Sequence, residues 1–343
     1  MMNFKKYFFS HLKSGIRPFV CILVVALVVT LLVGISEQPD MAYDIDGMYV
    51  DDYNSTLYLP VTLMCVLIYA LPVMEFSFFK KRINLDCAYA LPISRKTMGA
   101  VHYLSGLTML LGTFTASYLV NFILLLTRGP GWFDFLPMIP HFFICLLLGF
   151  SMYSFMVFVF NRANTRGDGI WFMILYSFVF AVIASAIMVI IDNNSLFNEG
   201  YAAVLWGVID QFTQSVQYVV ELSDSGRRLF WDTPELIGWL IFWLSVGVLS
   251  AIGFFLSFGR ERTERTEEIS DSFFGFRTLI PIYAVCGILL FGAWNYILFF
   301  VIIEVLAFIG YTVYRRGFHY KKSDIIILLS LFLFLIINFI INL

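Results

Sequence analysis

The sequence predicts an all-α polytopic membrane protein, and three observations carry that prediction. Of the 343 residues, 60% are hydrophobic and only 13% are charged, and the mean hydropathy is +0.84, as is typical of chains embedded in lipid. Apolar runs recur at roughly the length of about 20 residues that a helix needs to cross a hydrocarbon core of about 30 Å. The third observation is that Lys and Arg are concentrated in alternate connectors between these runs. The predicted spans are residues 18–36, 57–78, 99–126, 137–160, 169–191, 236–258, 278–293, 296–313 and 324–343.

The distribution of basic residues predicts the orientation of these nine spans. With the amino terminus in the cytosol, the connectors lie alternately inside and outside, and cytosolic connectors should be rich in Lys and Arg. Of the 22 Lys and Arg residues, all but Arg128, Arg227 and Arg228 fall on the cytosolic side. We therefore predict a multi-pass protein of the plasma membrane with a cytosolic amino terminus and an outer carboxyl end. The first run is long and no small-residue cleavage site follows it, so we expect no cleaved signal peptide.

Residues 1–17 precede the first span and have an amphipathic pattern. Apolar residues recur at helical spacing with lysines between them, which predicts a short elbow helix in the cytosolic interface. Pro18 favours a turn into the span, because proline begins or ends a helix more readily than it continues one. The alternative is an ordinary basic flank of the first span. The apolar members of the pattern are Phe4, Tyr7, Phe8 and Leu12.

The connector after the second span, residues 79–96, combines basic residues with an apolar insert. Pro92 restricts the backbone of the residue before it, and Ser94 can cap the helix that continues into the third span. We therefore predict a short helix followed by a turn, which would stand as a rigid knob at the membrane surface. A basic flank with an incidental turn is the alternative, but it does not account for the apolar residues 87–91.

Two later segments separate the spans into groups. The outer connector between the fifth and sixth spans has an apolar stretch, residues 196–222, which is interrupted by Asp210, Gln211, Gln214 and Gln217. We predict a helix or re-entrant hairpin there, because non-helical backbone at membrane depth needs protein to cover it. Residues 259–277 form a charged cytosolic linker, in which the alternating charges of residues 259–268 predict a solvated helix face with ion pairs. It divides a six-span core, residues 18–258, from a three-span extension, residues 278–343.

Few ionisable residues lie inside the predicted spans, and such residues are functional candidates by default. Glu304 is the deepest, and we take it as a candidate intramembrane polar site, although a structural hydrogen bond or a protonated carboxyl accounts for it better than a substrate contact. Glu75 lies near Lys80 and Lys81, and local pairing explains it.

The histidines and cysteines predict no metal site. His102 and His141 fall near opposite interfaces of the predicted topology and have no partner at ligand spacing. The five cysteines form no CxxC pair, and we interpret them as small apolar residues.

The layout resembles the permease subunits of ABC transporters of the type-two export family, of the Gram-positive type. In that family an elbow helix precedes six spans, and the connector after the second span carries a leucine-proline-hydrophobic-serine-arginine motif. Here the motif reads Leu91-Pro92-Ile93-Ser94-Arg95. The resemblance covers about residues 1–275. It implies a six-helix export-permease core with an amino-terminal elbow helix plus about three additional transmembrane helices, and it leaves the role of residues 278–343 open.

The resemblance also implies how such a chain would work. It would be the membrane half of an ATP-driven transporter for an amphiphilic substrate, a peptide, an antibiotic or a lipid-like molecule, surrounded by membrane lipid and paired with an identical or related second permease subunit. A separate P-loop ATPase subunit would bind ATP and Mg²⁺, since this sequence has no phosphate-binding Gly-rich loop of its own. The ATPase would dock on Phe79, Arg82, Asp86, Tyr89, Leu91, Pro92, Ile93, Ser94 and Arg95.

On this interpretation the chain is not an enzyme and holds no cofactor, metal or catalytic residue, and we expect no nucleic acid partner. Two alternatives stay open. A membrane-embedded enzyme would need a catalytic cluster inside the spans, whereas the adjacent pair Glu267 and Glu268 lies in the linker. A secondary transporter working alone would be expected to have several intramembrane charges and broken helices.

Overall fold

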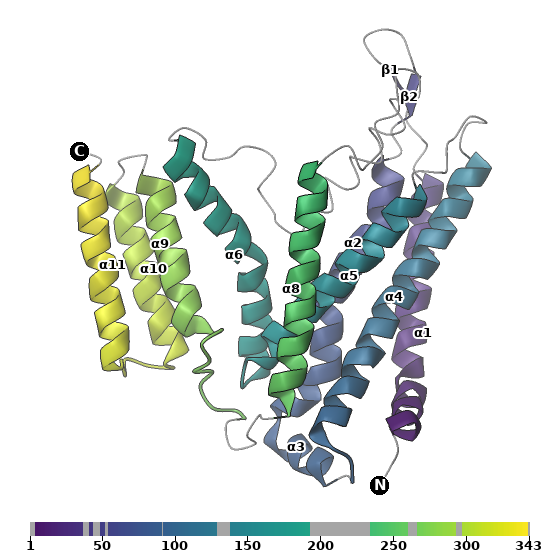
Figure 1. Ribbon diagram of the computed structural model, residues 1–343, viewed down its shortest axis with the longest axis horizontal. Coiled ribbons are helices and arrows are strands. Elements are labelled where there is room, and N and C mark those ends of the chain that lie inside the picture. The colour runs from purple at the N-terminus through teal and green to yellow at the C-terminus, as the bar shows by residue number, and fades with distance from the viewer. Residues whose placement is uncertain are drawn as a thin grey trace. The chain divides into compact units, whose positions relative to one another are not determined.

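The computed structural model describes residues 4–36, 41–43, 49–51, 54–90, 92–128, 138–192, 234–259, 266–292 and 297–341. Most of these residues lie in long helices (Figure 1). The long helices are α1 (Phe4–Ser36), α2 (Asn54–Phe76), α4 (Arg95–Arg128), α5 (Met138–Asn161), α6 (Arg166–Asp192), α8 (Pro234–Phe258), α9 (Phe276–Gly292), α10 (Ile297–Tyr314) and α11 (Lys322–Ile341). The short elements are the antiparallel strands β1 (Met41–Tyr43) and β2 (Tyr49–Asp51), the 3₁₀ turn η1 (Ser77–Lys80) and the helix α3 (Arg82–Tyr89).

The helical membrane architecture predicted from the sequence is confirmed. Each of the nine predicted apolar runs coincides with a helix in the described part of the chain. Within those residues, five helices are long and apolar enough to cross a membrane, and two further apolar helices are shorter. The five are Phe4–Ser36, Leu59–Lys80, Arg95–Thr127, Met138–Asn161 and Leu240–Phe258.

Helix α1 differs from the prediction, because it continues through Pro18 without the expected turn. Proline removes one backbone hydrogen bond, but membrane helices tolerate it where neighbouring groups support the chain. That support comes from α4. Gly15 lies so close to this helix that a Cβ added to it would be 3.0 Å from the Met109 side chain. A Cβ added to Gly34 would be 2.8 Å from the Leu124 side chain. Helix α1 therefore contacts α4 on both sides of Pro18, and a separate elbow helix stays unconfirmed.

The described chain forms two compact units. The first contains α1 to α4, most of α5, and α8, with α4 packed against α1, α2 and α8. The second contains α6, α9, α10 and α11, together with Lys80–Arg82 and the end of α5. The division differs from the predicted boundary at residues 259–277, since α6, the fifth predicted span, belongs with the extension.

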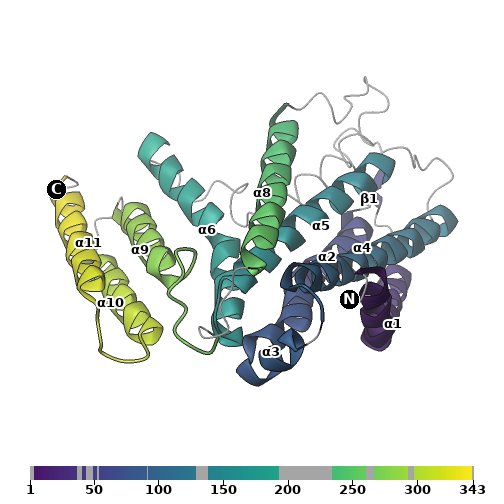
Figure 2. The ribbon, with the colours of Figure 1, turned by 60° about the horizontal axis from the view of Figure 1, so that its bottom comes forward.

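The second unit is held by apolar packing and by polar contacts, which include a hydrogen bond between α6 and α9 and the buried ion pair of Arg315 with Asp324. Helix α6 packs against α9, where the hydroxyl of Tyr283 donates a hydrogen bond to the carbonyl of Leu175. Helices α9, α10 and α11 lie side by side (Figure 2) around a core of Ala284, Ala307 and Leu331. The small alanines allow close approach of the helices, as is common in membrane bundles.

The charged run that the sequence predicted as a solvated helix face, residues 259–268, lies mostly outside the described residues and stays a prediction. The linker is described over residues 266–275. It forms turns, and Ser270 within it is buried. The hydroxyl of Ser270 accepts a hydrogen bond from Asn164 N at 2.8 Å and donates one to Asp168 Oδ2 at 2.6 Å. These partners lie about 100 residues earlier in the chain, and no local pattern in the sequence indicated them. Residues 260–265 and the predicted re-entrant segment 196–222 lie outside the described residues.

Candidate functional site

The connector between α2 and α4 contains the short helix that the sequence predicted, α3. The predicted cap is also present. Ser94 Oγ accepts a hydrogen bond from Thr97 N at 3.1 Å and lies 2.7 Å from the Thr97 hydroxyl, just before α4 begins at Arg95. Such a cap satisfies an amide that has no partner within the helix. The start of α4 is therefore fixed by the motif itself.

Lys80 fixes the other end of the connector. Its side chain is buried, and Nζ donates hydrogen bonds to the carbonyls of Asn161 at 3.0 Å and Ala163 at 2.7 Å. A lysine is a favourable partner for carbonyls at a helix carboxyl end, which lack partners within the helix. The predicted pairing of Glu75 with Lys80 and Lys81 was wrong, because Lys80 caps α5 and Glu75 has other partners.

The surface of α3 is amphipathic. Leu85 is buried, whereas Ile83 has 80% of its side-chain surface exposed. Arg82 and Asp86 are exposed beside it. The docking residues predicted from the sequence did not include Ile83. In a helix, residues two positions apart do not share a face. The spacing of Ile83 and Leu85 could therefore have indicated that one of the two is exposed.

The remaining predicted docking residues have different environments. Pro92, Ser94 and Arg95 are exposed and Ile93 is half-buried. Phe79 is instead buried, with its ring centroid 4.9 Å from that of His102 and 5.4 Å from that of Phe258. Its prediction as a docking residue is corrected, because it packs in the helix bundle. Tyr89 ends α3, and Leu91 lies outside the described residues.

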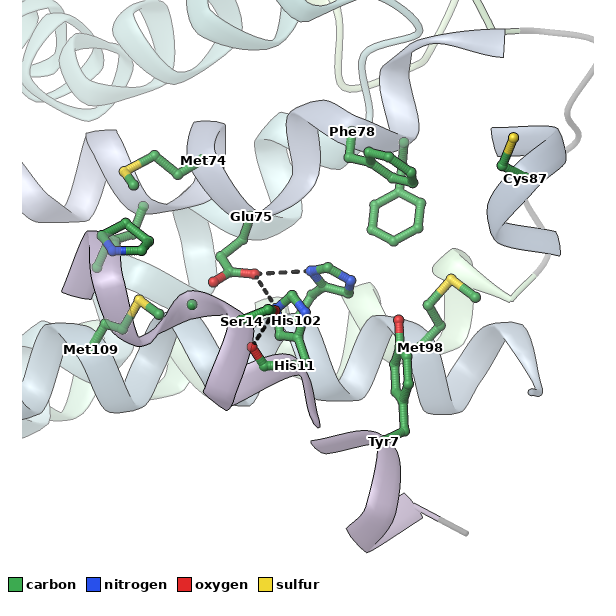
Figure 3. Close-up of a pocket in the computed structure, with 14 residues that line it drawn as sticks. Tyr7, His11, Ser14, Met74, Glu75, Phe78, Cys87, Met98, His102 and Met109 are labelled. Carbon is green, nitrogen blue, oxygen red and sulfur yellow. Dashed lines mark hydrogen bonds and ion pairs between the residues drawn. The ribbon is translucent and has the colours of Figure 1, made fainter. Parts of the chain in front are cut away.

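A polar cluster that the sequence did not predict lies where α1, α2 and α4 meet (Figure 3). Glu75 Oε2 accepts hydrogen bonds from His11 Nε2 at 3.0 Å and from His102 Nδ1 at 2.9 Å. Its second oxygen, Oε1, accepts a hydrogen bond from Ser105 Oγ at 3.1 Å. One carboxylate therefore joins three helices, and two imidazole rings lie with their centroids 4.1 Å apart.

A glycine makes room for this cluster. A Cβ added to Gly106 of α4 would lie 2.0 Å from the Tyr153 hydroxyl and 3.3 Å from Glu75 Cγ. The Tyr153 hydroxyl itself donates to the carbonyl of Tyr103 at 3.3 Å. Glycine at this position therefore leaves room for the Tyr153 hydroxyl beside α4 and for a tight contact with Glu75.

A cavity of about 540 Å³ lies beside the cluster, and His11, Glu75 and His102 are part of its wall. The rest of the wall is mainly apolar and includes Met74, Met98 and Met109 (Figure 3). A few polar groups in the wall of a mainly apolar cavity are typical of a small-ligand site.

The sequence predicted that His102 and His141 are both isolated from other metal-ligating residues, and this prediction was wrong for His102. His102 belongs to the cluster, in which His11, Glu75 and His102 each offer a ligand atom and all three atoms lie within 4.8 Å of one another. This group could hold a metal ion. His141 lies in another buried contact, with Nδ1 3.0 Å from the Tyr118 hydroxyl.

Glu304 belongs to α10 of the second unit. Its side chain is partly buried, and its Oε2 atom has no hydrogen-bond partner among the described residues. No described acidic or basic side chain forms an ion pair with it. Its role as a candidate polar site stays a prediction.

Comparison of the chain with family models, characterised proteins and solved structures found no match. The fold defines a class, that of helical membrane proteins with several helices long and apolar enough to span a bilayer. Two features of the described residues are candidates for function: the helix α3 with its exposed Ile83, and the largely buried group of His11, Glu75 and His102.

Proposed function

We propose that this chain is the transmembrane permease subunit of an ATP-driven ABC transporter, and that α3 with the following turn docks a separate P-loop ATPase subunit. The observation that carries the proposal is an eight-residue helix between two membrane helices that leaves Ile83 80% exposed, with Arg82 and Asp86 beside it. An exposed isoleucine on a connector gains free energy when a partner covers it, about 1.5–3 kcal/mol for full burial. Charged neighbours would orient such a partner.

We propose that a movement of the connector is passed on to the helices at its two ends, because contacts hold it at both ends and in the middle. Lys80 before α3 and the Ser94 cap after it fix both ends, and Leu85 anchors the middle. Phe79 is packed against His102 and Phe258. A displacement of α3 by an ATPase would therefore move the ends of α2 and α4 rather than bend a loose loop.

The remaining parts of the proposal follow from the sequence. The sorting of Lys and Arg supports a cytosolic amino terminus. With this orientation α3 would lie in the cytosol, and the proposed membrane is the plasma membrane. The amino-terminal end of α1 and α3 lie at the same end of the first unit (Figure 1). The substrate would be an amphiphile, the path would form with a second permease subunit, and ATP and Mg²⁺ would bind to the ATPase.

The experiment that tests this proposal is affinity purification of the tagged chain from its native membrane, with identification of the proteins that co-purify. We expect a P-loop ATPase in stoichiometric amount. The substitution Ile83→Asp should lower the yield of co-purified ATPase roughly 30-fold. This corresponds to a loss of about 2 kcal/mol of binding free energy, which is the size that marks a hot-spot residue.

The matched control is Phe318→Asp. Phe318 is similarly exposed, at 74%, but lies between α10 and α11, and its replacement should leave the yield of ATPase unchanged. A wild-type chain that purifies alone and transports its substrate would contradict the proposal and favour a secondary transporter or a membrane-embedded enzyme. Equal ATPase yield from Ile83→Asp would contradict the docking role of α3.

A further inference from the structure

The group of His11, Glu75 and His102 has the spacing of a metal site. In a tetrahedral zinc site the metal lies about 2.0–2.2 Å from imidazole nitrogen and carboxylate oxygen, so neighbouring ligand atoms are roughly 3.3 Å apart. Here the two nitrogens lie 3.0 and 2.9 Å from Glu75 Oε2, and all three ligand atoms lie within 4.8 Å of one another. Small rotations of the side chains would open enough room for an ion between them.

The surroundings of Glu75 favour this use. Ser105 donates a hydrogen bond to Oε1, in the way that an outer hydrogen bond orients a metal-ligating carboxylate. Oε2 is hydrogen-bonded to both imidazoles (Figure 3). Among the described residues that line the cavity, none is a lysine or an arginine. A cation would therefore meet one carboxylate and two imidazoles with no competing positive side chain in the cavity wall.

We propose that His11, Glu75 and His102 bind a divalent transition-metal ion, with Zn²⁺ as the probe, and that the cavity beside them supplies the remaining coordination position. Two histidines and one glutamate with an open fourth position are a known donor set for zinc. The ligating nitrogens would be His11 Nε2 and His102 Nδ1, so each imidazole would carry its proton on the other ring nitrogen when the metal is bound.

The consequence of binding would be a clamp between three helices of the first unit. His11 lies on α1, Glu75 near the end of α2, and His102 near the start of α4. The His102 ring contacts Phe79, which directly precedes Lys80 and α3. An ion at this place would hold α2 and α4 together at the two ends of the connector. The inference rests on the geometry of the cluster and does not require the proposed ATPase partner.

The test is zinc binding by the purified full chain in detergent. The chain is stripped with a chelator, equilibrated with Zn²⁺, and analysed by titration calorimetry and by elemental analysis after gel filtration. We expect one Zn²⁺ per chain. Glu75→Gln and His102→Gln should each weaken binding by roughly 10–100-fold or more, as loss of ligands or of their supporting bonds does in other zinc sites.

The matched control is His141→Gln, which removes another buried histidine of the first unit and should retain the ion. If Glu75→Gln fails to fold, His11→Asn serves instead, because His11 lies near the start of the chain and its side chain is 20% exposed. Co²⁺ gives a second readout, since a site of this kind should show visible absorption that is lost in the variants. A wild-type chain that retains no Zn²⁺, or a His11→Asn chain that binds it as the wild type does, would overturn the proposal.

Discussion

His102 Nδ1 in α4 lies 2.9 Å from Glu75 Oε2 in α2. This buried pair joins the two helices that the connector with α3 links in the chain. His11 from α1 reaches the same oxygen atom. The cluster therefore sets how three helices meet at the end of the first unit that carries the connector. Both the proposed transmission of movement through α3 and the proposed metal site depend on this arrangement.

Replacing Glu75→Ala should destabilise the first unit. Three donors, His11, His102 and Ser105, lose their acceptor. Hydrogen bonds between membrane helices are worth about 0.6 kcal/mol each on average, and a buried donor left without a partner costs about 1–3 kcal/mol. We expect a loss of about 2 kcal/mol or more, measured as a lower midpoint of thermal unfolding in detergent with a chelator present. The control is Glu268→Ala, which removes an exposed carboxylate from the linker; an equal midpoint for Glu75→Ala and the wild type would contradict the structural role.

Gly247 should not tolerate a side chain. Its added Cβ would lie 2.5 Å from the Cα of Ser151 on α5, and a backbone atom cannot move aside by rotating. Overpacking of this kind typically costs 1–3 kcal/mol, so Gly247→Ala should lower the unfolding midpoint. Gly238 lies on the same helix, α8, with nothing within 4 Å of its added Cβ. Gly238→Ala should leave the midpoint unchanged or raise it, because alanine favours helix. The same loss in both variants would show that α5 and α8 do not pack as described.

The pH dependence of the second unit should include Asp271. Lys321 lies 2.7 Å from its Oδ2 atom, and this bond, with a hydrogen bond from Tyr314, lowers the pKa of Asp271 below its ordinary value of 3.8. Because the folded-state pKa is lowered, the stabilisation is present at neutral pH and is lost as the pH falls through the lowered value. Asp271 is partly exposed, so the contribution should not exceed about 1 kcal/mol.

The measurement compares unfolding midpoints of wild type and Asp271→Asn from pH 7 to about pH 3. The wild type should be more stable at pH 7, and the difference should shrink below about pH 4. Asp86→Asn, which removes the same charge from the exposed surface of α3, serves as the control. A difference that stays constant down to pH 3 would contradict the assignment.

Glu304→Gln should leave function intact. Oε2 of this residue has no hydrogen-bond partner among the described residues, and the residue lies outside the first unit. Glutamine matches its shape, so we expect a stability change below about 1.5 kcal/mol and an unchanged rate and pH profile of ATP hydrolysis in the purified complex. A change in the pH profile would instead assign this carboxyl to the transport path.

The helices and the connector could be predicted because their signals are local. A span needs about 20 apolar residues, and each predicted run coincides with a helix. Pro92 and Ser94 indicated a helix, a turn and a cap within a few residues, and α3 and the Ser94 cap confirm them.

The packing could not be predicted in the same way. Nothing in the apolar sequence of α6 indicates that it packs against α9. His11 and His102 lie 64 and 27 positions from Glu75 in the sequence, and they meet it only through the packing of three helices. At Pro18 a local signal for a turn was outweighed by packing of α1 along α4.

The measurement that tests the docking role of α3 most directly is crosslinking from Cys87 in native membranes. Of the five cysteines, Cys21 and Cys87 are exposed and the others are buried, so a Cys21→Ser chain can be labelled selectively on α3. We predict a photo-crosslinked product that contains a P-loop ATPase, is absent from Cys87→Ser and is strongly reduced by Ile83→Asp. Crosslinks from Cys87 only to lipid or to other parts of this chain, in membranes where transport is active, would contradict the account.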